Sequence, residues 1–134
     1  MTLQISSELL ISIHEIAART PHREVCGLLL GHGTCVTEIR HSPNVAPDPT
    51  CHFEVDPAQL IAAHKAARSG GPAVLGVWHS HPNGACQPSL EDARAAAPDG
   101  LFWLIVAKGV AGCWRAVAAG ALQGRFDPVA LAVL

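Results

Sequence analysis

The sequence predicts an α/β domain in which a mixed sheet carries helices on both faces. Three observations indicate this class. Apolar runs of strand length alternate with helical patterns, several neighbouring strands are joined by hairpin-length turns, and no linker or repeat divides the 134 residues. Hairpins make antiparallel pairs and helical crossovers make parallel ones, so the sheet is expected to be mixed. A chain of this length forms one domain, residues 1–134, with a core of its own.

Apolar spacing and turn residues place the elements of the first half. Ser6 or Ser7 caps a helix whose apolar residues recur at helical spacing up to Arg19. A buried strand, a glycine turn and an alternating return strand then predict a hairpin. The expected strands are 3–5, 25–30, 35–40 and 51–55, and the proline-rich segment 42–50 is expected to be a surface loop.

Stronger boundary signals place the second half. Asp56 before Pro57 is an N-cap followed by proline at the first helical position, and Gly70-Gly71 ends that helix. A short helix is expected to begin at Ser89. The remaining expected elements are strands 74–78, 101–107 and 113–117 and a helix over 89–97, while the apolar tail 128–134 is either an inner strand or a dimer surface.

Composition excludes several classes of function. The formal net charge is −2 without a basic stripe, which argues against nucleic-acid binding. No run approaches the roughly 20 apolar residues of a membrane span, and the N-terminus has no secretory signal pattern. The five cysteines are odd in number and form no Cys-x-x-Cys pair. This usage indicates reduced thiols and a cytoplasmic location.

His79 and His81 carry the strongest functional signal, because they end the apolar run 73–78. Side chains two residues apart leave the same face of a strand, so both imidazoles are expected at one point. Pro82 ends the strand, and the helix that begins at Ser89 can bring Asp92 back towards them. Two imidazoles and one carboxylate hold zinc with its fourth position left to water, as in hydrolytic centres. Zinc lowers the pKa of that water from about 15.7 to about 7.

Two further residues complete a hydrolytic site. Glu24 begins a buried strand, so its carboxylate is expected at a sheet end in low-dielectric surroundings that raise its pKa towards that of a general base. Taken alone, Glu24 also fits a surface residue at a strand edge. Ser89 can donate its hydroxyl to a developing oxyanion, and with Asp92 it also resembles a capping box, a role compatible with metal binding. The other histidines are interpreted as packed or surface residues: His14, His22, His32, His41, His52 and His64.

Two segments together resemble a known family. They are Glu24-Val25-Cys26-Gly27-Leu28-Leu29-Leu30-Gly31 and His79-Ser80-His81-Pro82, the latter followed after seven residues by Ser89 and after two more by Asp92. This is similar to the JAMM (MPN+, or JAB/MPN domain) zinc metalloproteases, whose pattern is Glu, His-x-His, seven residues, Ser, two residues, Asp. The resemblance extends from the helix before Glu24 through at least Ala118 and includes Asn44 and Phe53.

The resemblance implies a three-layer α/β/α sandwich of the cytidine-deaminase-like type with a mixed central sheet. It implies one zinc ion held by His79, His81 and Asp92, with water as fourth ligand. Glu24 would be the general base and Ser89 the oxyanion stabiliser. The reaction would be hydrolysis of a peptide or isopeptide bond after the C-terminal Gly-Gly of a ubiquitin-like protein, with Glu24 assisting attack by the zinc-bound water and protonating the leaving amine.

The chain resembles the short prokaryotic branch of that family, because segments 51–78 and 89–134 are too compact for ubiquitin-gripping insertions. The expected partner is therefore a ubiquitin-like or sulfur-carrier protein, and the low lysine content suggests a bacterial gene. Two alternatives remain. A non-catalytic MPN-type interaction module would lose ligands or base, yet all five residues are present. A RadC-like DNA-repair protein also fits the segment from His79 to Asp92, but the Glu24 segment and the absence of a basic face argue against it.

Loops around the predicted centre are the remaining candidates for function. The loops 42–50 and 83–87 are expected to line the groove for the substrate tail. Cys86 lies between His81 and Ser89, so its thiolate either fills the fourth zinc position or, as the favoured interpretation, makes no contact with the metal.

Overall fold

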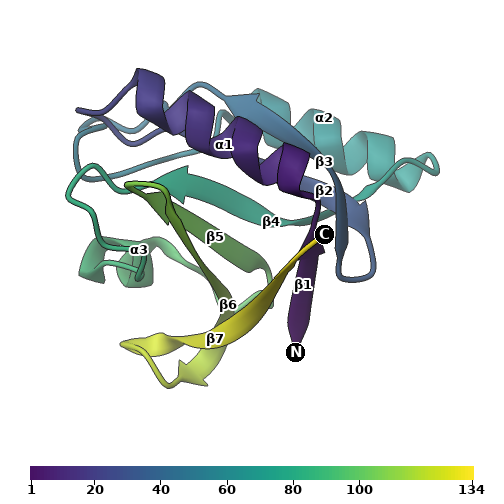
Figure 1. The fold of residues 1–134 in the computed structure, drawn as a ribbon. Coiled ribbons are helices and arrows are strands. Elements are labelled where there is room, and N and C mark those ends of the chain that lie inside the picture. The colour runs from purple at the N-terminus through teal and green to yellow at the C-terminus, as the bar shows by residue number, and fades with distance from the viewer.

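The computed structural model describes residues 1–134 and contains seven strands and three helices (Figure 1). None of the helices combines the length and the apolar character that a bilayer crossing requires. In chain order the elements are β1 Thr2–Ile5, α1 Ser7–Arg19, β2 Cys26–His32, β3 Cys35–Ser42, α2 Pro57–Arg68, β4 Ala73–Ser80, α3 Leu90–Ala95, β5 Phe102–Ala107, β6 Val110–Gly120 and β7 Gly124–Val133.

The strands form one mixed sheet in the order β1-β3-β2-β4-β5-β6-β7, and β7 returns to pair with β1. Strand β2 runs antiparallel to β3 and β4, whereas β4 and β5 are parallel. The predicted mixed sheet is confirmed. The three-layer sandwich is not confirmed, because the pairing of β7 with both β6 and β1 closes the sheet into a barrel. The apolar tail 128–134 is thus an inner strand over most of its length.

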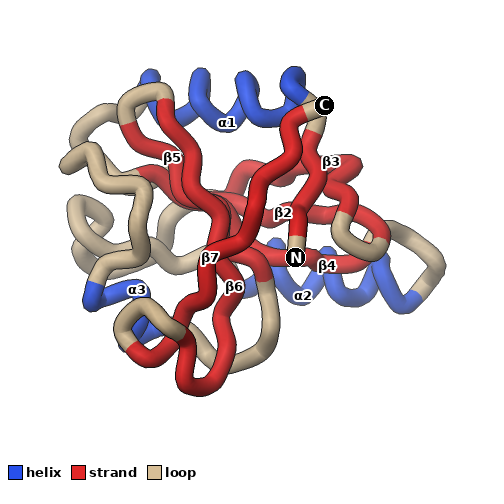
Figure 2. Tube along the Cα trace, turned by 60° about the horizontal axis from the view of Figure 1, so that its bottom comes forward, coloured by secondary structure: helices blue, strands red, loops and turns tan.

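Helices cover both faces of the central strands, as the sequence predicts (Figure 2). Side chains of β2 alternate between the faces. Leu29 packs in the main core, to which α1 contributes Ile13, whereas Leu28 and Leu30 pack with Ala63 of α2 on the opposite face. The α1 and α2 helices therefore hold the strand pair β2–β4 between them, and that pair carries the site.

The cap signals of the sequence are confirmed at both long helices. Ser6 Oγ accepts the N–H of Leu9 at 3.1 Å, and Asp56 Oδ1 accepts the N–H of Ala58 at 3.0 Å. The α3 helix is shorter than predicted and ends at Ala95, because Ala96 is already extended ahead of Pro98.

The strand predicted over 51–55 is wrong. Cys51 ends a turn, residues 52–54 are irregular, and Val55 makes one isolated bridge with Asn44. The Asn44 side chain makes the hydrogen bonds to this segment that a neighbouring strand would otherwise make. Its amide donates to the carbonyls of Glu24 and His52 at 2.9 and 3.0 Å, and its oxygen accepts the N–H of Glu54 at 3.0 Å. One side chain thus ties the loop to the start of β2.

Candidate metal centre

His79 and His81 meet at the C-terminal end of β4, as predicted. His79 is fully buried, with Cys26 of β2 and Ile105 of β5 as its register partners. His81 follows the strand, and its N–H donates to the carbonyl of Val106 at 3.0 Å. The two Nε2 atoms lie 3.0 Å apart. The spacing of two along the strand therefore directs both rings to one point.

Asp92 reaches this point from the first turn of α3. Its Oδ2 lies 3.2 Å from Nε2 of His79 and 3.1 Å from Nε2 of His81. The capping box with Ser89 fixes the carboxylate: Asp92 Oδ2 accepts the Ser89 N–H at 2.9 Å, and Ser89 Oγ accepts the Asp92 N–H at 3.0 Å. The capping box and the cluster of possible ligands therefore share the Asp92 carboxylate, and the sequence pattern is compatible with both roles.

The three donor atoms fit a zinc ion. Bonds of about 2.0–2.1 Å in a tetrahedron separate neighbouring ligand atoms by about 3.3 Å, close to the 3.0–3.2 Å found between these nitrogen and oxygen atoms. Nδ1 of His81 lies 2.6 Å from the carbonyl of Ala85. Because a carbonyl only accepts, Nδ1 carries a proton, so in a neutral ring the lone pair would be on Nε2, where a metal could take it. Three protein ligands leave one position of the tetrahedron to water or substrate.

The electrostatics suit a cation as well. Burial lowers the pKa of His79, which favours the neutral imidazole that a metal requires. Burial opposes ionisation of Asp92, but its contacts with His79 and His81 and the N–H of Ser89 outweigh it and hold the pKa of this carboxyl well below its usual range. The centre therefore contains a buried carboxylate anion, and a cation between these residues would compensate its charge.

Glu24 lies beside this centre at the start of β2. The antiparallel pairing of Cys26 with His79 places Glu24 opposite His81. Its side chain is buried, and Oε1 has no hydrogen-bond partner. Burial raises its pKa to about 7, against the effect of His81 and with the support of the negative charge of Asp92. Ligand atoms of Glu24, His79, His81 and Asp92 all lie within 4.8 Å of one another.

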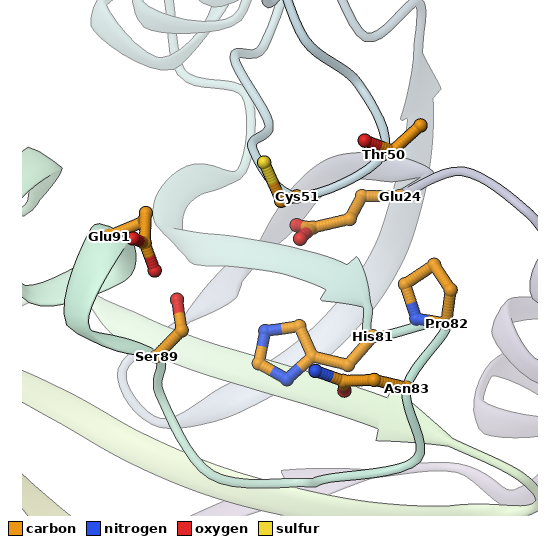
Figure 3. Close-up of a pocket in the computed structure, with 8 residues that line it drawn as sticks. All are labelled: Glu24, Thr50, Cys51, His81, Pro82, Asn83, Ser89 and Glu91. Carbon is orange, nitrogen blue, oxygen red and sulfur yellow. The ribbon is translucent and has the colours of Figure 1, made fainter.

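Glu24, His81 and Ser89 line one pocket of about 160 Å³, together with Asn83 and Glu91 (Figure 3). Thr50 and Cys51 form its wall beside Glu24, and Pro82 lies next to His81. The two loops expected to line the groove, 42–50 and 83–87, thus both reach the pocket. Because Ser89 Oγ already accepts from the Asp92 N–H, its own O–H proton is free to be donated into the pocket.

A family comparison agrees with this geometry. The family described as prokaryotic homologs of the JAB domain matches residues 6–118. The chain belongs to the prokaryotic JAB-domain family. The prediction of JAMM/MPN membership is therefore confirmed.

Two proteases from other organisms match this JAB domain over part of its length. The desampylase of Haloferax volcanii is 37% identical over 93 residues, which cover 68% of this chain and 67% of the desampylase. The probable TtuB-protein conjugate cleaving protease of Thermus thermophilus is 36% identical over 78 residues, or 58% of this chain and 52% of that protein. The match therefore spans only about half of the Thermus protein.

Solved structures match the domain from end to end. A protein from Desulfitobacterium hafniense superimposes with a TM-score of 0.82 at 26% identity, covering 100% of this chain and 93% of that one. A JAB1/MPN domain protein from Archaeoglobus fulgidus has a TM-score of 0.62 at 24% identity, covering 97% and 99%. The fold is thus that of JAB/MPN domains.

Aromatic rings hold the buried histidine of this JAB domain in place. Phe53 stacks on His79 with 4.1 Å between ring centroids and 18° between planes, and Trp103 meets the same imidazole edge-on at 5.5 Å. The sequence pointed to Phe53 only as part of the stretch that the family resemblance covers, not as a site residue. No fixed spacing relates a stacking ring to a ligand, so the residues alone gave no signal.

Cys86 does not join the metal centre. Its carbonyl accepts the indole N–H of Trp114 at 3.1 Å, and its thiol is not among the converging ligand groups. The favoured interpretation of a loop thiol without metal contact agrees with this placement. Cys51 and Glu91 also line the pocket, and they were not predicted to do so because nothing in their spacing relates them to His79 and His81.

Proposed function

We propose that this chain is a zinc metallopeptidase that hydrolyses the peptide or isopeptide bond after the C-terminal Gly-Gly of a ubiquitin-like or sulfur-carrier protein. The convergence of His79, His81 and Asp92 within 3.0–3.2 Å, beside an unpartnered Glu24 carboxylate, carries the proposal. The names of the relatives support the substrate class, because one is a desampylase and another cleaves TtuB-protein conjugates. These activities also favour the peptidase over the RadC-like and non-catalytic alternatives.

His79, His81 and Asp92 would hold the zinc ion. When bound, zinc supplies Lewis-acid chemistry that makes water nucleophilic at neutral pH and polarises a carbonyl group. The chain itself contributes the fixed ligand orientation, through the Ala85 carbonyl on His81 and the capping box on Asp92. The ring of Phe53 excludes water from the buried face of His79.

Glu24 moves the proton of the reaction. Its Oε1, which has no partner in the pocket, accepts a proton from the attacking water and delivers it to the leaving amine nitrogen. The O–H of Ser89 donates to the oxygen that becomes negative at the scissile carbonyl. The products are a free Gly-Gly carboxylate and an amine, and no cysteine is required as nucleophile.

The location and the substrate path belong to the same proposal. All five cysteines are free, and Cys26 and Cys113 are buried, which suits a reducing cytoplasm. A tail that ends in Gly-Gly has no side chains to clash in a small pocket, so Thr50 on one wall and Asn83 on the other would enclose it.

Cleavage of a carrier-protein fusion with a Gly-Gly junction tests the proposal. Wild type should cut after the second glycine, and Glu24→Gln should lower kcat by about 10²–10⁴-fold while keeping its zinc, because only the proton acceptor is lost. Glu15→Gln on the exposed side of α1 is the matched control and should cut at the wild-type rate. An active Glu24→Gln, or cleavage that persists in chelator, would contradict the proposal.

A further inference from the structure

A second group of metal-binding side chains lies on the loop between β3 and α2. Asp48, Cys51 and His52 are all exposed, and one ligand atom from each lies within 4.8 Å of the others. The Cys51 Sγ is 3.3 Å from Asp48 Oδ2 and 3.1 Å from His52 Nδ1. Thiolate, imidazole and carboxylate are the three ligand types that zinc takes in proteins.

The loop holds these donors in place through its own backbone. Asp48 Oδ1 accepts the N–H and the hydroxyl of Thr50 at 3.2 and 2.5 Å, which leaves Oδ2 facing the thiol. The N–H of His52 donates to the carbonyl of Asp48 at 3.1 Å and closes the turn. The donor atoms therefore need little rearrangement to surround one ion.

The loop also forms part of the catalytic pocket. Cys51 lines that pocket on the same side as Glu24 (Figure 3). The N–H of Glu24 donates to the carbonyl of Pro49 at 2.7 Å, and the Asn44 amide links the carbonyls of Glu24 and His52. Of the three donors only Cys51 lines the pocket, so an ion bound to this loop would lie at the edge of the pocket, on a segment that is hydrogen-bonded to the backbone of Glu24.

We propose that Asp48, Cys51 and His52 form a second site for a thiophilic divalent cation such as zinc, and that its occupation obstructs the catalytic pocket. Binding forms a metal–sulfur bond, and the Cys51 S–H proton leaves to solvent. The hydrogen bond to Asp48 raises the pKa of the thiol, so the free side chain is protonated at neutral pH and must release this proton. The obstruction of cleavage rests on the proposed function, whereas the ion site itself does not.

Cobalt titration of the full chain, preloaded with one equivalent of zinc, tests the site. A thiolate-to-cobalt charge-transfer absorption should appear, because the Glu24, His79, His81 and Asp92 cluster contains no sulfur. Cys51→Ser should abolish this absorption, and His52→Gln should weaken the apparent affinity about 10-fold or more. Cys35→Ser, at the far end of β3, is the matched control and should titrate like wild type. No absorption in wild type, or the same absorption in Cys51→Ser, would overturn the site.

Cleavage of the Gly-Gly fusion in rising zinc tests the effect on the pocket. Wild type and Cys35→Ser should slow down at zinc concentrations that fill the second site, and Cys51→Ser should not. Equal slowing in all three proteins would overturn the obstruction. If no protein cleaves at all, the proposed function fails, while the cobalt absorption still decides the site.

Discussion

Asp92 combines two roles in one oxygen atom. Its Oδ2 accepts the N–H of Ser89, which caps α3, and the same atom lies within 3.2 Å of both imidazole nitrogens. At the same scale, Glu24 is a buried acid without a partner for Oε1. Such a group costs folding energy, as expected of a residue that is placed for the proposed reaction rather than for stability.

The Glu24 carboxyl makes the stability of the metal-free protein depend on pH. Its pKa is about 7 in the folded chain and 4.5 without the fold. Between these values the folded state binds more protons than the unfolded one, so stability falls as pH rises through this window. Glu24→Gln removes the effect. In chelator, urea unfolding should show the variant gaining stability over wild type at pH 8 but not at pH 4.5. The same difference at both pH values would refute the assignment.

Single residues of the site were predictable where the chain fixes their spacing. His79 and His81 follow from the period of a strand, and Ser89 with Asp92 from the period of a helix start. The role of Glu24 depends on the pairing of β2 with β4, which sets Cys26 beside His79. That register, and the approach of Cys51 to the pocket, result from tertiary packing and leave no local pattern.

The element that organises the site is the unit from β4 to α3. Strand β4 lies between β2 and β5 and ends at the histidines, and the capping box starts α3 where Asp92 can meet them. Caps and proline positions predicted the helices well. The 51–55 segment was mistaken for a strand because its apolar Phe53 stacks on His79 instead of packing in a sheet. The side chain of Asn44, outside the segment, accepts the backbone N–H of Glu54 in place of a neighbouring strand.

A comparison of two N-cap serines can distinguish the capping role of Ser89 from its proposed catalytic role. Ser89→Ala and Ser6→Ala each remove a side-chain acceptor from a helix start, so each should lower the free energy of unfolding by about 1 kcal/mol. Only Ser89→Ala should also lower kcat, by about 10²–10³-fold, because only Ser89 lines the pocket. Urea unfolding and steady-state cleavage measure both. A comparable loss of kcat in Ser6→Ala would show that the effect of Ser89 is one of stability.

At the scale of the whole molecule, β7 closes the sheet. It joins β6 to β1, so the two ends of the chain pair with each other. The sequence predicted neither this closure nor the choice between inner strand and dimer surface for residues 128–134. The apolar residues of the tail indicate that other parts of the protein cover them, but not which strands do so.

Two valines of β7 test the closure. Val129 is 9% exposed in the main core, whereas Val133 is 49% exposed. Val129→Ala should lower the free energy of unfolding by about 1–3 kcal/mol, and Val133→Ala by about 0.5 kcal/mol or less. Equal and small effects in urea unfolding would contradict a core in which β7 is an inner strand.

Zinc content per chain, measured after dialysis against metal-free buffer, tests the metal centre most directly. In chains that also carry Cys51→Ser, which removes the proposed second site, the otherwise unchanged protein and Glu24→Gln should each retain one ion, since Glu24 is proposed to act in proton transfer. His81→Gln and Asp92→Asn should retain almost none, although Asp92→Asn keeps an oxygen that can still cap α3. An unchanged zinc content in these two variants would contradict the assignment of His79, His81 and Asp92 as the ligands.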